Sequence, residues 1–398
     1  MTGAERGIVA AASYEARARG ISRAVPLREV RRLCPEAIIV PSDYETYSLF
    51  SERMFAIMRR YTSLVEEYSI DEAFADITGL QRVLHGSYED IGRRMKADIE
   101  RELGITVSVG VSLTKTLAKI ASDYKKPSGL TVVPGRAIDV FLRGLPVEKV
   151  WGIGPRTTPY CRQVGIKDAL DFARRDDAWV RARFVKPLQE TWMELNGHVV
   201  YPVTDGAASP QHTIGKTRTF TPPSADKEFV YAQLLKNAEN ACIKARRHRL
   251  AARGAAIFLK TQDFRYAGTE IRFTRATAFP MEIESHLRRA FDGLYLPRTQ
   301  YRATGIVLLA LESADVTQLT LFEKPPEVEK LRRLYGAMDV LAEKFGKHAV
   351  RLAGSERAHR GAQHERERGA VTLRKLSRLK GETDRQHLTI PVLTGSVA

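Results

Sequence analysis

The chain has 398 residues, of which 43% are hydrophobic, and a formal net charge of +16 at pH 7. This length predicts two to four domains with hydrophobic cores, and the charge favours a polyanionic partner, nucleic acid before an anionic membrane surface. No apolar run approaches the roughly 18 residues of a spanning helix, which argues against a membrane segment, and the first residues lack the pattern of a secretory signal.

In chain order, the first third of the sequence alternates short helical and strand-like segments. Residues 1–37 form a small basic segment whose pattern favours helix. The helices predicted after it carry apolar residues at three- and four-residue spacing. Strands are expected at 37–41, 65–69, 73–77, 105–112 and 130–133, and helices at 43–61, 91–103 and 114–124. The order strand, helix, strand, strand, helix, strand is the split βαβ pattern of a ferredoxin-like sheet. The predicted fold class is therefore α+β, in several domains.

The remainder divides into helical, α/β and polar parts. Residues 139–199 predict short helices between glycine turns, and the Pro/Gly/Ser-rich stretch 200–211 predicts a linker. Helices at 229–252 and 286–294 lead into strands at 256–260 and 304–311, which favours a small repeated βαβ layout. After Glu312 the sequence turns polar, and the Arg-, His- and Glu-rich residues 351–385 are expected to be mobile.

The three cysteines, Cys34, Cys161 and Cys242, lie far apart and fit no zinc or redox spacing. We expect them to be buried thiols in a reducing cytoplasm.

Two adjacent carboxylates, Asp71 and Glu72, occupy the turn of the predicted hairpin, within the stretch YSIDEAFAD. Because adjacent carboxylates repel, this placement favours a divalent cation between them, as in sites of phosphoryl transfer. The competing interpretation is a solvated acidic turn. The apolar neighbours Ile70 and Phe74 favour the metal site, because they hold the pair on a sheet.

Three further residues suit phosphate oxygens. Tyr14 and Arg17 are three positions apart, so they share one face of a helix and offer a guanidinium beside a hydroxyl. Lys126 precedes Pro127, which favours an extended backbone at a helix end and can aim the ammonium into a cleft. The competing interpretations are an exposed basic helix and an ordinary loop lysine.

Glycine turns and basic residues predict contacts with a nucleic-acid backbone. Gly152, Gly154 and Gly165 lie between short helices in the form of a helix-hairpin-helix, where backbone N–H groups can approach a phosphate. The alternative is a packing-only helical hairpin. The basic stretch 244–253 and the residues Lys216, Arg218, Lys260, Arg272 and Arg275 could follow a duplex backbone. A solvated helix face explains some of these charges, but it explains the net charge less well.

A short apolar group follows the last predicted strand, in TQLTLFEK. Its anchors are Gln318, Leu319, Leu321 and Phe322. Apolar anchors beside a polar segment favour docking into a partner's pocket, and local packing as a strand cap is the alternative.

These motifs, taken in order, resemble the bacterial Y-family translesion DNA polymerases. YSIDEAFAD, SVGVSLTKTLAKIASDYKKPSGLTVV, VWGIG and QLTLF carry the resemblance, over about residues 8–323. EEYSIDEAF, VWGIG and GAMDVLAEKFG are similar to the UmuC branch, and KKPSG is similar to the DinB branch as well.

The resemblance implies an architecture and a set of roles. It implies fingers at 1–42, a ferredoxin-like palm at 43–135, a helix-hairpin-helix thumb at 136–199, a linker at 200–211, an α/β little finger at 212–312 and a clamp-binding segment with a tail at 313–398. Asp71 and Glu72 correspond to palm carboxylates that bind Mg²⁺, and Tyr14, Arg17 and Lys126 to residues that hold the incoming deoxynucleoside triphosphate. Gln318, Leu319, Leu321 and Phe322 correspond to the peptide that docks on the bacterial sliding clamp. Primer–template DNA and accessory mutagenesis subunits of the SOS response are the other implied partners, in the cytoplasm at the nucleoid.

The sequence departs from this pattern at its start. Family members open with a strand bearing an Asp-x-Asp-x-Phe-Phe-type segment, which supplies a further metal-binding aspartate, and no such segment precedes Tyr68. We therefore expect a polymerase that lacks its N-terminal palm strand and is inactive or weak in this form. The rival hypotheses are a non-catalytic protein that binds DNA and the clamp, and an unrelated helix-hairpin-helix nuclease or repair scaffold.

Overall fold

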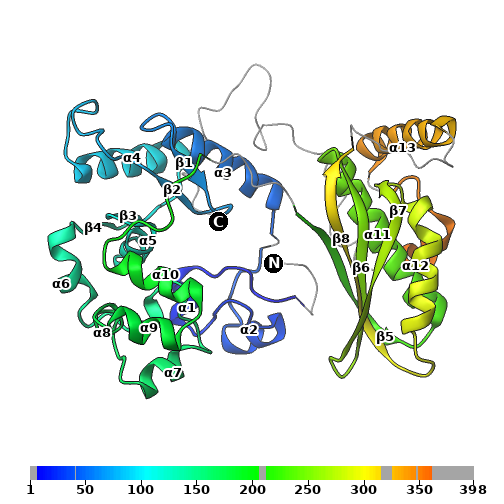
Figure 1. Ribbon diagram of the computed structural model, residues 1–398, viewed down its shortest axis with the longest axis horizontal. Helices are drawn as coiled ribbons and strands as arrows, with labels where there is room; N and C mark the ends of the chain where they lie inside the picture. The colour runs from blue at the N-terminus through cyan, green and yellow to red at the C-terminus, as the bar shows by residue number, and fades with distance from the viewer. Residues whose placement is uncertain (1–6, 41, 206–211, 315–324, 347, 361–398) are drawn as a thin grey trace. The chain divides into compact units, whose positions relative to one another are not determined.

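The computed structural model describes all residues except 1–6, 41, 206–211, 315–324, 347 and 361–398 (Figure 1). The described residues divide into two compact units, one comprising residues 43–205 and the other residues 7–42 and 212–360. None of the described helices is long and apolar enough to cross a membrane. All three cysteines are free and buried, as predicted.

The N-terminal segment folds around two short helices, α1 (Tyr14–Ala18) and α2 (Leu27–Leu33). The side chain of Ser13 accepts the N–H of Ala16 and so caps α1. A small apolar cluster that includes Val9, Ile21 and Val30 holds the segment together. The strand expected at 37–41 was wrong for its described residues, 37–40, which pair with no other strand and leave Ile38 79% exposed.

The unit around residues 43–205 begins with the predicted alternation of helices and strands. Its elements are α3 (Tyr44–Met58), β1 (Val65–Glu67), β2 (Ala73–Ala75), α4 (Tyr88–Leu103), β3 (Val109–Val111), α5 (Lys115–Tyr124) and β4 (Leu130–Val132). A capping box between Ser87 and Asp90 starts α4, and Gly104 ends it with φ +65°, a left-handed conformation that favours glycine. Apolar residues of α3 and α4, such as Phe55 and Ile99, pack in one core with Val65 of β1.

The single ferredoxin-like sheet expected here does not form among the described residues. β1 and β2 pair antiparallel, β3 and β4 pair parallel, and each pair is a separate two-stranded sheet of three-residue strands. Within the part of the chain that the structure describes, no strand pairs with both of these sheets.

Short helices follow, as the sequence predicted. They are α6 (Ile138–Leu142), α7 (Thr158–Gln163), α8 (Ala169–Ala173), α9 (Asp177–Arg183) and α10 (Lys186–Leu195), with 3₁₀ turns η1 (Gly135–Ala137) and η2 (Val147–Lys149). Their apolar core also includes Leu117 and Ile120 of α5. The buried carboxylate of Glu194 on α10 accepts the N–H and the hydroxyl of Thr116, at 2.9 and 2.6 Å, and thereby fastens α10 to the start of α5.

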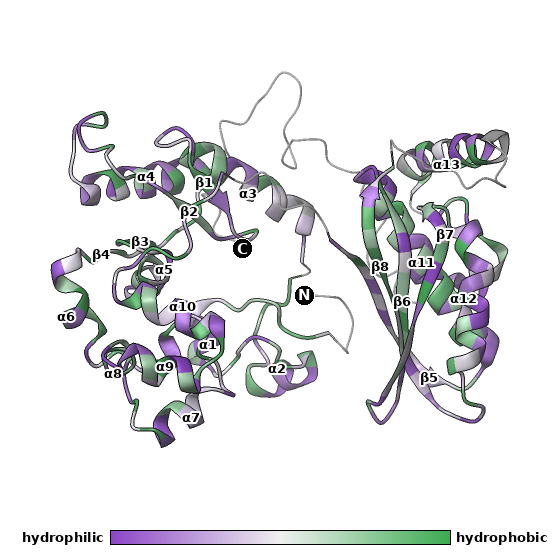
Figure 2. Cartoon of the chain, viewed as in Figure 1, coloured by the Kyte–Doolittle hydropathy of each residue, from purple (hydrophilic) through white to green (hydrophobic). Residues whose placement is uncertain are grey.

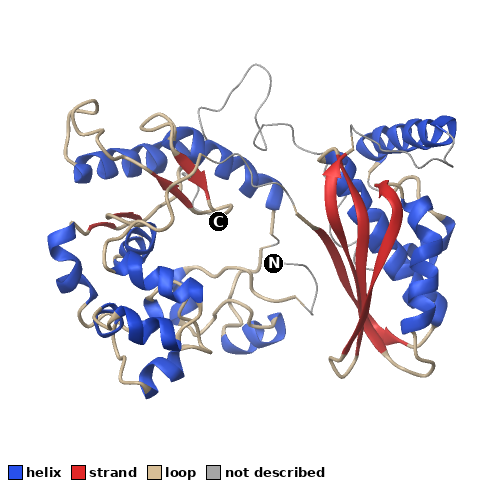
Figure 3. Ribbon diagram, in the orientation of Figure 1, coloured by secondary structure: helices blue, strands red, loops and turns tan. Residues whose placement is uncertain are grey.

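The second unit contains a long four-stranded sheet. Its elements are β5 (Ile214–Ser224), α11 (Lys227–Arg247), β6 (Leu250–Thr261), β7 (Tyr266–Thr277), α12 (Pro280–Leu294) and β8 (Tyr301–Ser313). The strand order is β5-β8-β6-β7, and every neighbouring pair is antiparallel. Figure 3 shows α11 and α12 on one side of this sheet, and Figure 2 shows the hydrophobic run of β8 at its centre. The element order β5-α11-β6 followed by β7-α12-β8 confirms the repeated βαβ layout, although β5 and β7 were not recognised as strands in the sequence.

The chain after residue 324 returns to this sheet–helix unit. Its elements are α13 (Pro325–Phe345), η3 (Ala353–Ser355) and α14 (Glu356–Arg360). On α13, Tyr335 stacks on Phe279 with ring centroids 5.2 Å apart, and Asp339 forms a bidentate ion pair with Arg246, both contacts at 2.7 Å. The mobility expected from residue 351 onward was wrong for 351–360, since Ala358 is 2% exposed and α14 packs against α11. Residues 361–385 lie outside the described residues.

Candidate active site and nucleic-acid interface

The acidic pair Asp71 and Glu72 lies in the turn between β1 and β2. The carbonyl of Glu72 accepts the N–H groups of Tyr68 and Ser69, at 3.1 and 2.9 Å, which closes the turn. The Ser69 hydroxyl donates to Asp71 Oδ1 at 2.8 Å. Asp71 is exposed and Glu72 is half-buried, so the turn presents carboxylate oxygens at the surface of this unit.

Two lysines of α5 face the carboxylates of this hairpin. Lys119 forms an ion pair with Glu72 Oε1, and Lys115, one helical turn earlier, pairs with Glu66 of β1. Burial acts to raise the pKa of Glu66, but hydrogen bonds from Lys115 and Thr204 outweigh it and leave this pKa below its usual range. Sequence reasoning missed both pairs, although the four-residue spacing of the two lysines was a usable signal.

An aromatic cluster joins the acidic hairpin to the first glycine turn. The ring of Tyr68 lies 5.3 Å from that of Trp151 and 5.8 Å from that of Phe74, in edge-to-face geometry. Trp151 directly precedes Gly152. The cluster therefore couples the positions of the two motifs, and neither the tyrosine nor the tryptophan was singled out from the sequence.

The acidic pair fits a hard divalent cation. Carboxylate oxygens are the ligands that Mg²⁺ and Ca²⁺ prefer, and Mg²⁺ is commonly held by one or two carboxylates together with substrate phosphates. Lys119 occupies one Glu72 oxygen, so a cation at Glu72 competes with this ammonium. Among the described residues, no third carboxylate, histidine or cysteine joins Asp71 and Glu72 in a metal-binding group.

The predicted phosphate-binding residues lie in two separate parts of the chain. Lys126 follows the end of α5, is 46% exposed and pairs with Asp123 at 2.5 Å. In the N-terminal segment, the guanidinium of Arg17 lies over the ring of Tyr14, 5.0 Å from its centroid, and its Nε donates to the carbonyl of Ala12. Tyr14 and Arg17 thus share one face, as their spacing predicted, and both are exposed.

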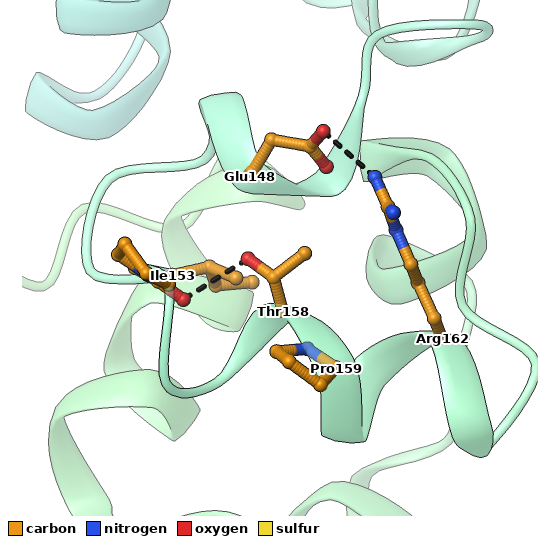
Figure 4. Close-up of a pocket in the computed structure, with 7 residues that line it drawn as sticks. Glu148, Ile153, Thr158, Pro159 and Arg162 are labelled. Atoms are coloured by element: carbon orange, nitrogen blue, oxygen red, sulfur yellow. Dashed lines mark hydrogen bonds and ion pairs between the residues drawn. The ribbon is translucent and has the colours of Figure 1, made fainter.

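A pocket of about 480 Å³ lies at the second glycine of the first turn (Figure 4). Its lining is Glu148, Ile153, Gly154, Pro155, Thr158, Pro159 and Arg162. The Thr158 hydroxyl donates to the carbonyl of Gly154, and Arg162 pairs with Glu148 at 2.9 Å. Arg162 is 60% exposed, and sequence reasoning did not single it out.

The three glycines of this motif differ in what the fold requires of them. Gly152 and Gly165 have φ of +93° and +79°, so their backbone conformation itself demands glycine. Gly154 has no such conformation, and a Cβ added there would meet nothing within 4 Å. Packing within the chain therefore does not explain Gly154, and the space beside it is open to a partner.

The predicted basic residues of the second unit fall into distinct environments. Arg272 is exposed and, paired with Gly254, belongs to the sheet face away from α11. Lys216 and Arg218 pair with Ile306 and Thr304, which places them on the helix side at the edge strand. Burial and then the nearby Lys244 and Arg247 lower the pKa of Lys216, and such a group of cations suits a polyanion.

The assignment of Arg275 to DNA contact needs correction. This side chain is 6% exposed and forms an ion pair with Glu282 of α12, so it lacks the exposure that a phosphate contact requires. The anchors Gln318, Leu319, Leu321 and Phe322 lie outside the described residues.

Comparison with known proteins identifies the family. The model of the impB/mucB/samB family matches residues 1–123, and that of its C-terminal domain matches residues 211–321. A protein of Desulfatibacillum aliphaticivorans named DNA polymerase IV is 33% identical over 349 residues, 87% of each chain. A DNA polymerase IV of Moorella thermoacetica is 34% identical over 353 residues, 88% of this chain and 86% of that one. The chain belongs to the Y-family, DinB-like DNA polymerases.

Solved structures support the Y-family fold. The Y-family polymerase chimera Dbh-Dpo4(243-245)-Dbh superposes with a TM-score of 0.66 at 24% identity, over 77% of this chain and 88% of that one. An insertion ternary complex of Dbh DNA polymerase gives a TM-score of 0.50, also at 24% identity, over 76% and 87% of the two chains. The α+β class predicted from the sequence is thereby confirmed at the level of the whole fold. Members of this family use divalent metal ions, which agrees with the donor set of the acidic turn.

Proposed function

We propose that the chain carries out template-directed DNA synthesis across damaged template. The observation that carries this proposal is the acidic turn, with Asp71 and Glu72 held at the end of a hairpin and faced by Lys119, in a Y-family sequence. The relatives are named DNA polymerase IV. The substrates proposed for this chain are a primer–template and deoxynucleoside triphosphates.

The proposed chemistry assigns a task to each group. Asp71 and Glu72 would hold Mg²⁺. When bound, the metal ions supply charge neutralisation for the transferring phosphoryl group and acidify the primer hydroxyl. Lys119 would give up its ion pair with one Glu72 oxygen when a metal ion binds there, and the Tyr68–Trp151 contact would keep the hairpin in position.

The triphosphate would be bound by Tyr14, Arg17 and Lys126. The cationic groups of Arg17 and Lys126 are exposed and can form charge-assisted hydrogen bonds with phosphate oxygens. Replacing either by alanine should weaken nucleotide use by about 1.5–3 kcal/mol, measured as a fall in kcat/KM for the nucleotide. Unchanged nucleotide kinetics in both variants would show that these side chains are ordinary surface residues that do not bind the nucleotide.

We further propose the family's domain roles for this chain. Residues 1–42 would be fingers, 43–135 palm, 136–199 thumb and 212–312 little finger, with 200–211 as the linker. The thumb would bind the DNA backbone through the open space at Gly154 and through Arg162, and the little finger through Arg272 and the cations around Lys216. Backbone contacts of this kind give binding that depends on salt more than on sequence.

Primer extension tests the proposal. The sequence contains no Asp-x-Asp-x-Phe-Phe-type segment, so we expect weak extension from the 398 residues alone. Extension should rise when a βα segment bearing that motif is added ahead of them. In the extended protein, Asp71→Asn and Glu72→Gln should each abolish incorporation, whereas Glu67→Gln, on the same hairpin but paired with Arg59, should not.

The rival hypothesis makes the opposite forecast. A non-catalytic protein that binds DNA and the clamp would show no incorporation even with the added segment, with either Mg²⁺ or Mn²⁺. Strong extension that survives Asp71→Asn would instead overturn the assignment of the acidic turn.

We also propose docking on the bacterial sliding clamp through Gln318, Leu319, Leu321 and Phe322, at the nucleoid in the cytoplasm. Two or three buried apolar anchors predict micromolar affinity after the ordering cost. A peptide spanning residues 316–324 should bind the clamp, and replacing both Leu321 and Phe322 by alanine should remove binding. Local packing would predict no peptide binding and a lower melting temperature for the double variant of the whole protein.

A further inference from the structure

Three potential metal ligands converge in the C-terminal part of the second unit. They are Glu239 of α11, His348, which precedes η3, and His359 of α14, and their ligand atoms all lie within 4.8 Å of one another. None of them belongs to the proposed polymerase site, and two lie beyond the residues matched by the family models. The sequence gives no sign of this group, because 109 positions separate Glu239 from His348.

Glu239 is a buried carboxylate, and one of its two oxygens lacks a hydrogen-bond partner. It is 4% exposed, and its Oε1 accepts the N–H of Leu352 at 2.7 Å. Its Oε2 is buried without a hydrogen-bond partner. The neighbouring Ser355 hydroxyl donates its proton to the carbonyl of Leu352, at 2.9 Å. A buried carboxylate in this state is costly unless a cation compensates for its charge.

The nearby cationic side chains have other contacts. Arg351 pairs with Glu356 at 2.7 Å, and the ammonium of Lys236 lies 3.4 Å from the carbonyl of Ala358.

The hydrogen bonds around His348 prepare it as a ligand. The amide nitrogen of Asn240 donates to the carbonyl of Lys236 at 2.7 Å, which turns Asn240 Oδ1 toward the imidazole. Nε2 of His348 lies 3.2 Å from this oxygen and donates its proton to it. Metal-binding histidines commonly donate their second ring N–H to such an oxygen. The ring of His359 lies 4.7 Å from that of His348, between centroids.

We propose that Glu239, His348 and His359 bind one divalent transition-metal ion of the zinc class, which fastens residues 348–360 to α11. Two imidazoles and a carboxylate are a donor set of zinc sites, and ligands about 2.1 Å from a tetrahedral ion lie about 3.4 Å apart. Modest side-chain rotations bring atoms that are within 4.8 Å to this spacing. Water would take the remaining position.

The site's role is structural. The segment already contacts α11 through Leu352 and Ala358, and Arg357 adds an exposed ion pair with Asp226. The metal would add a cross-link between this short segment and a helix more than a hundred residues earlier. Loss of the metal should loosen residues 348–360 while leaving the sheet in place.

Metal binding to the full chain, purified without a polyhistidine tag and stripped with a chelator, tests the proposal. We expect one Zn²⁺ per chain by elemental analysis and by competition with a chromophoric indicator, and Co²⁺ should give the visible absorption of a tetrahedral site. His348→Gln and His359→Gln should each weaken Zn²⁺ binding by about 100-fold or more, a loss typical of removing a direct ligand. His198→Gln and His248→Gln, at exposed histidines elsewhere, are the matched controls and should bind like the wild type.

A second readout does not depend on the variants folding well. Added Zn²⁺ should slow trypsin cleavage at Arg351 and Arg357 in the wild-type chain and raise its Tm. The proposal is overturned if the wild-type chain binds no Zn²⁺ more tightly than the double His348→Gln, His359→Gln variant does, or if Zn²⁺ leaves cleavage at these arginines unchanged.

Discussion

The two regions that flank residues 206–211 are held together in different ways. In 212–313 the strands are 11 to 13 residues long and form one sheet over a core of α11 and α12. In 43–205 every strand has three residues, and the two strand pairs are separate. Side-chain hydrogen bonds at Glu194 and Glu66 there link separate elements, in addition to the apolar cores.

This contrast locates the acidic turn in the region with short strands and two separate sheets. There, a buried carboxylate that loses one hydrogen-bond partner leaves donors unsatisfied. Substitutions at Glu194 and Glu66 therefore test the first region, and truncation of a buried residue in the long sheet tests the second.

The largest expected effect is a truncation in the long sheet. Ile257 of β6 is 1% exposed within the core of the second unit. Ile257→Ala should lower the free energy of unfolding of this region by about 2–5 kcal/mol, because it removes buried methylene groups and leaves a cavity. Urea unfolding with hydrogen exchange resolved by segment measures it, with the exposed Thr274→Ala as control. Equal loosening of residues 43–205 would contradict the separation of the two regions.

A somewhat smaller effect is expected from Glu194→Gln in the first region. The carboxylate accepts from Thr116 and from the N–H groups of Val200 and Tyr201, and glutamine replaces one acceptor oxygen by a donor. We expect a loss of about 2–3 kcal/mol in the free energy of unfolding, since a buried donor is left without an acceptor. Exposed Glu52→Gln is the control. A loss below 0.5 kcal/mol, on the order of a surface substitution, would show that these bonds do not hold α10 to α5.

The Glu66 pair should give a pH-dependent contribution of about 1 kcal/mol. Its pKa is lower in the folded chain than its ordinary value, so the stabilisation is complete above the unfolded pKa and is lost as pH falls through the folded one. The stability difference between wild type and Glu66→Gln should be largest near pH 7 and vanish in acid. Thermal unfolding across this range measures it, and a constant difference would exclude the ionised pair as its cause. Glu67→Gln, at a more exposed carboxylate, is the control.

The smallest expected effect on stability concerns Gly154. Because a Cβ there meets nothing within 4 Å, Gly154→Ala should change the free energy of unfolding by less than about 0.5 kcal/mol. It should still weaken DNA binding several-fold, since the methyl group enters the space proposed for a phosphate. Gly152→Ala should instead destabilise the chain by about 1 kcal/mol or more, because of its positive φ. Normal DNA binding by Gly154→Ala would contradict the proposal that a DNA phosphate enters the pocket beside Gly154.

Local signals predicted local structure well. The predicted helix end at Gly104 and helix start at Thr114 are where the structure has the end of α4 and the start of α5, whereas α4 begins at Tyr88, three residues before its predicted start. The short helices around Gly152 and Gly165 likewise follow from apolar spacing and glycine turns. These features depend on residues within one or two turns of each other, so the sequence pattern contains them.

Contacts between strands and side chains far apart in the sequence could not be predicted from such local signals. The sequence pattern could not show that β5 would pair with β8, about ninety residues later, or that β1–β2 and β3–β4 would be separate pairs among the described residues. Contacts such as Lys119 with Glu72, and Leu352 with Glu239, depend on the assembled fold. The order of residues 351–360 was missed for the same reason, because their partners lie on α11.

The docking of α13 extends the second unit beyond its sheet. Tyr335 of α13 stacks on Phe279 and Asp339 pairs with Arg246, so this helix, which begins at Pro325, is fastened to the unit in which β8 ends at Ser313. Ser313 and Pro325 are therefore both anchored on one body, and a cut in the chain between them should leave α13 attached through its side-chain contacts.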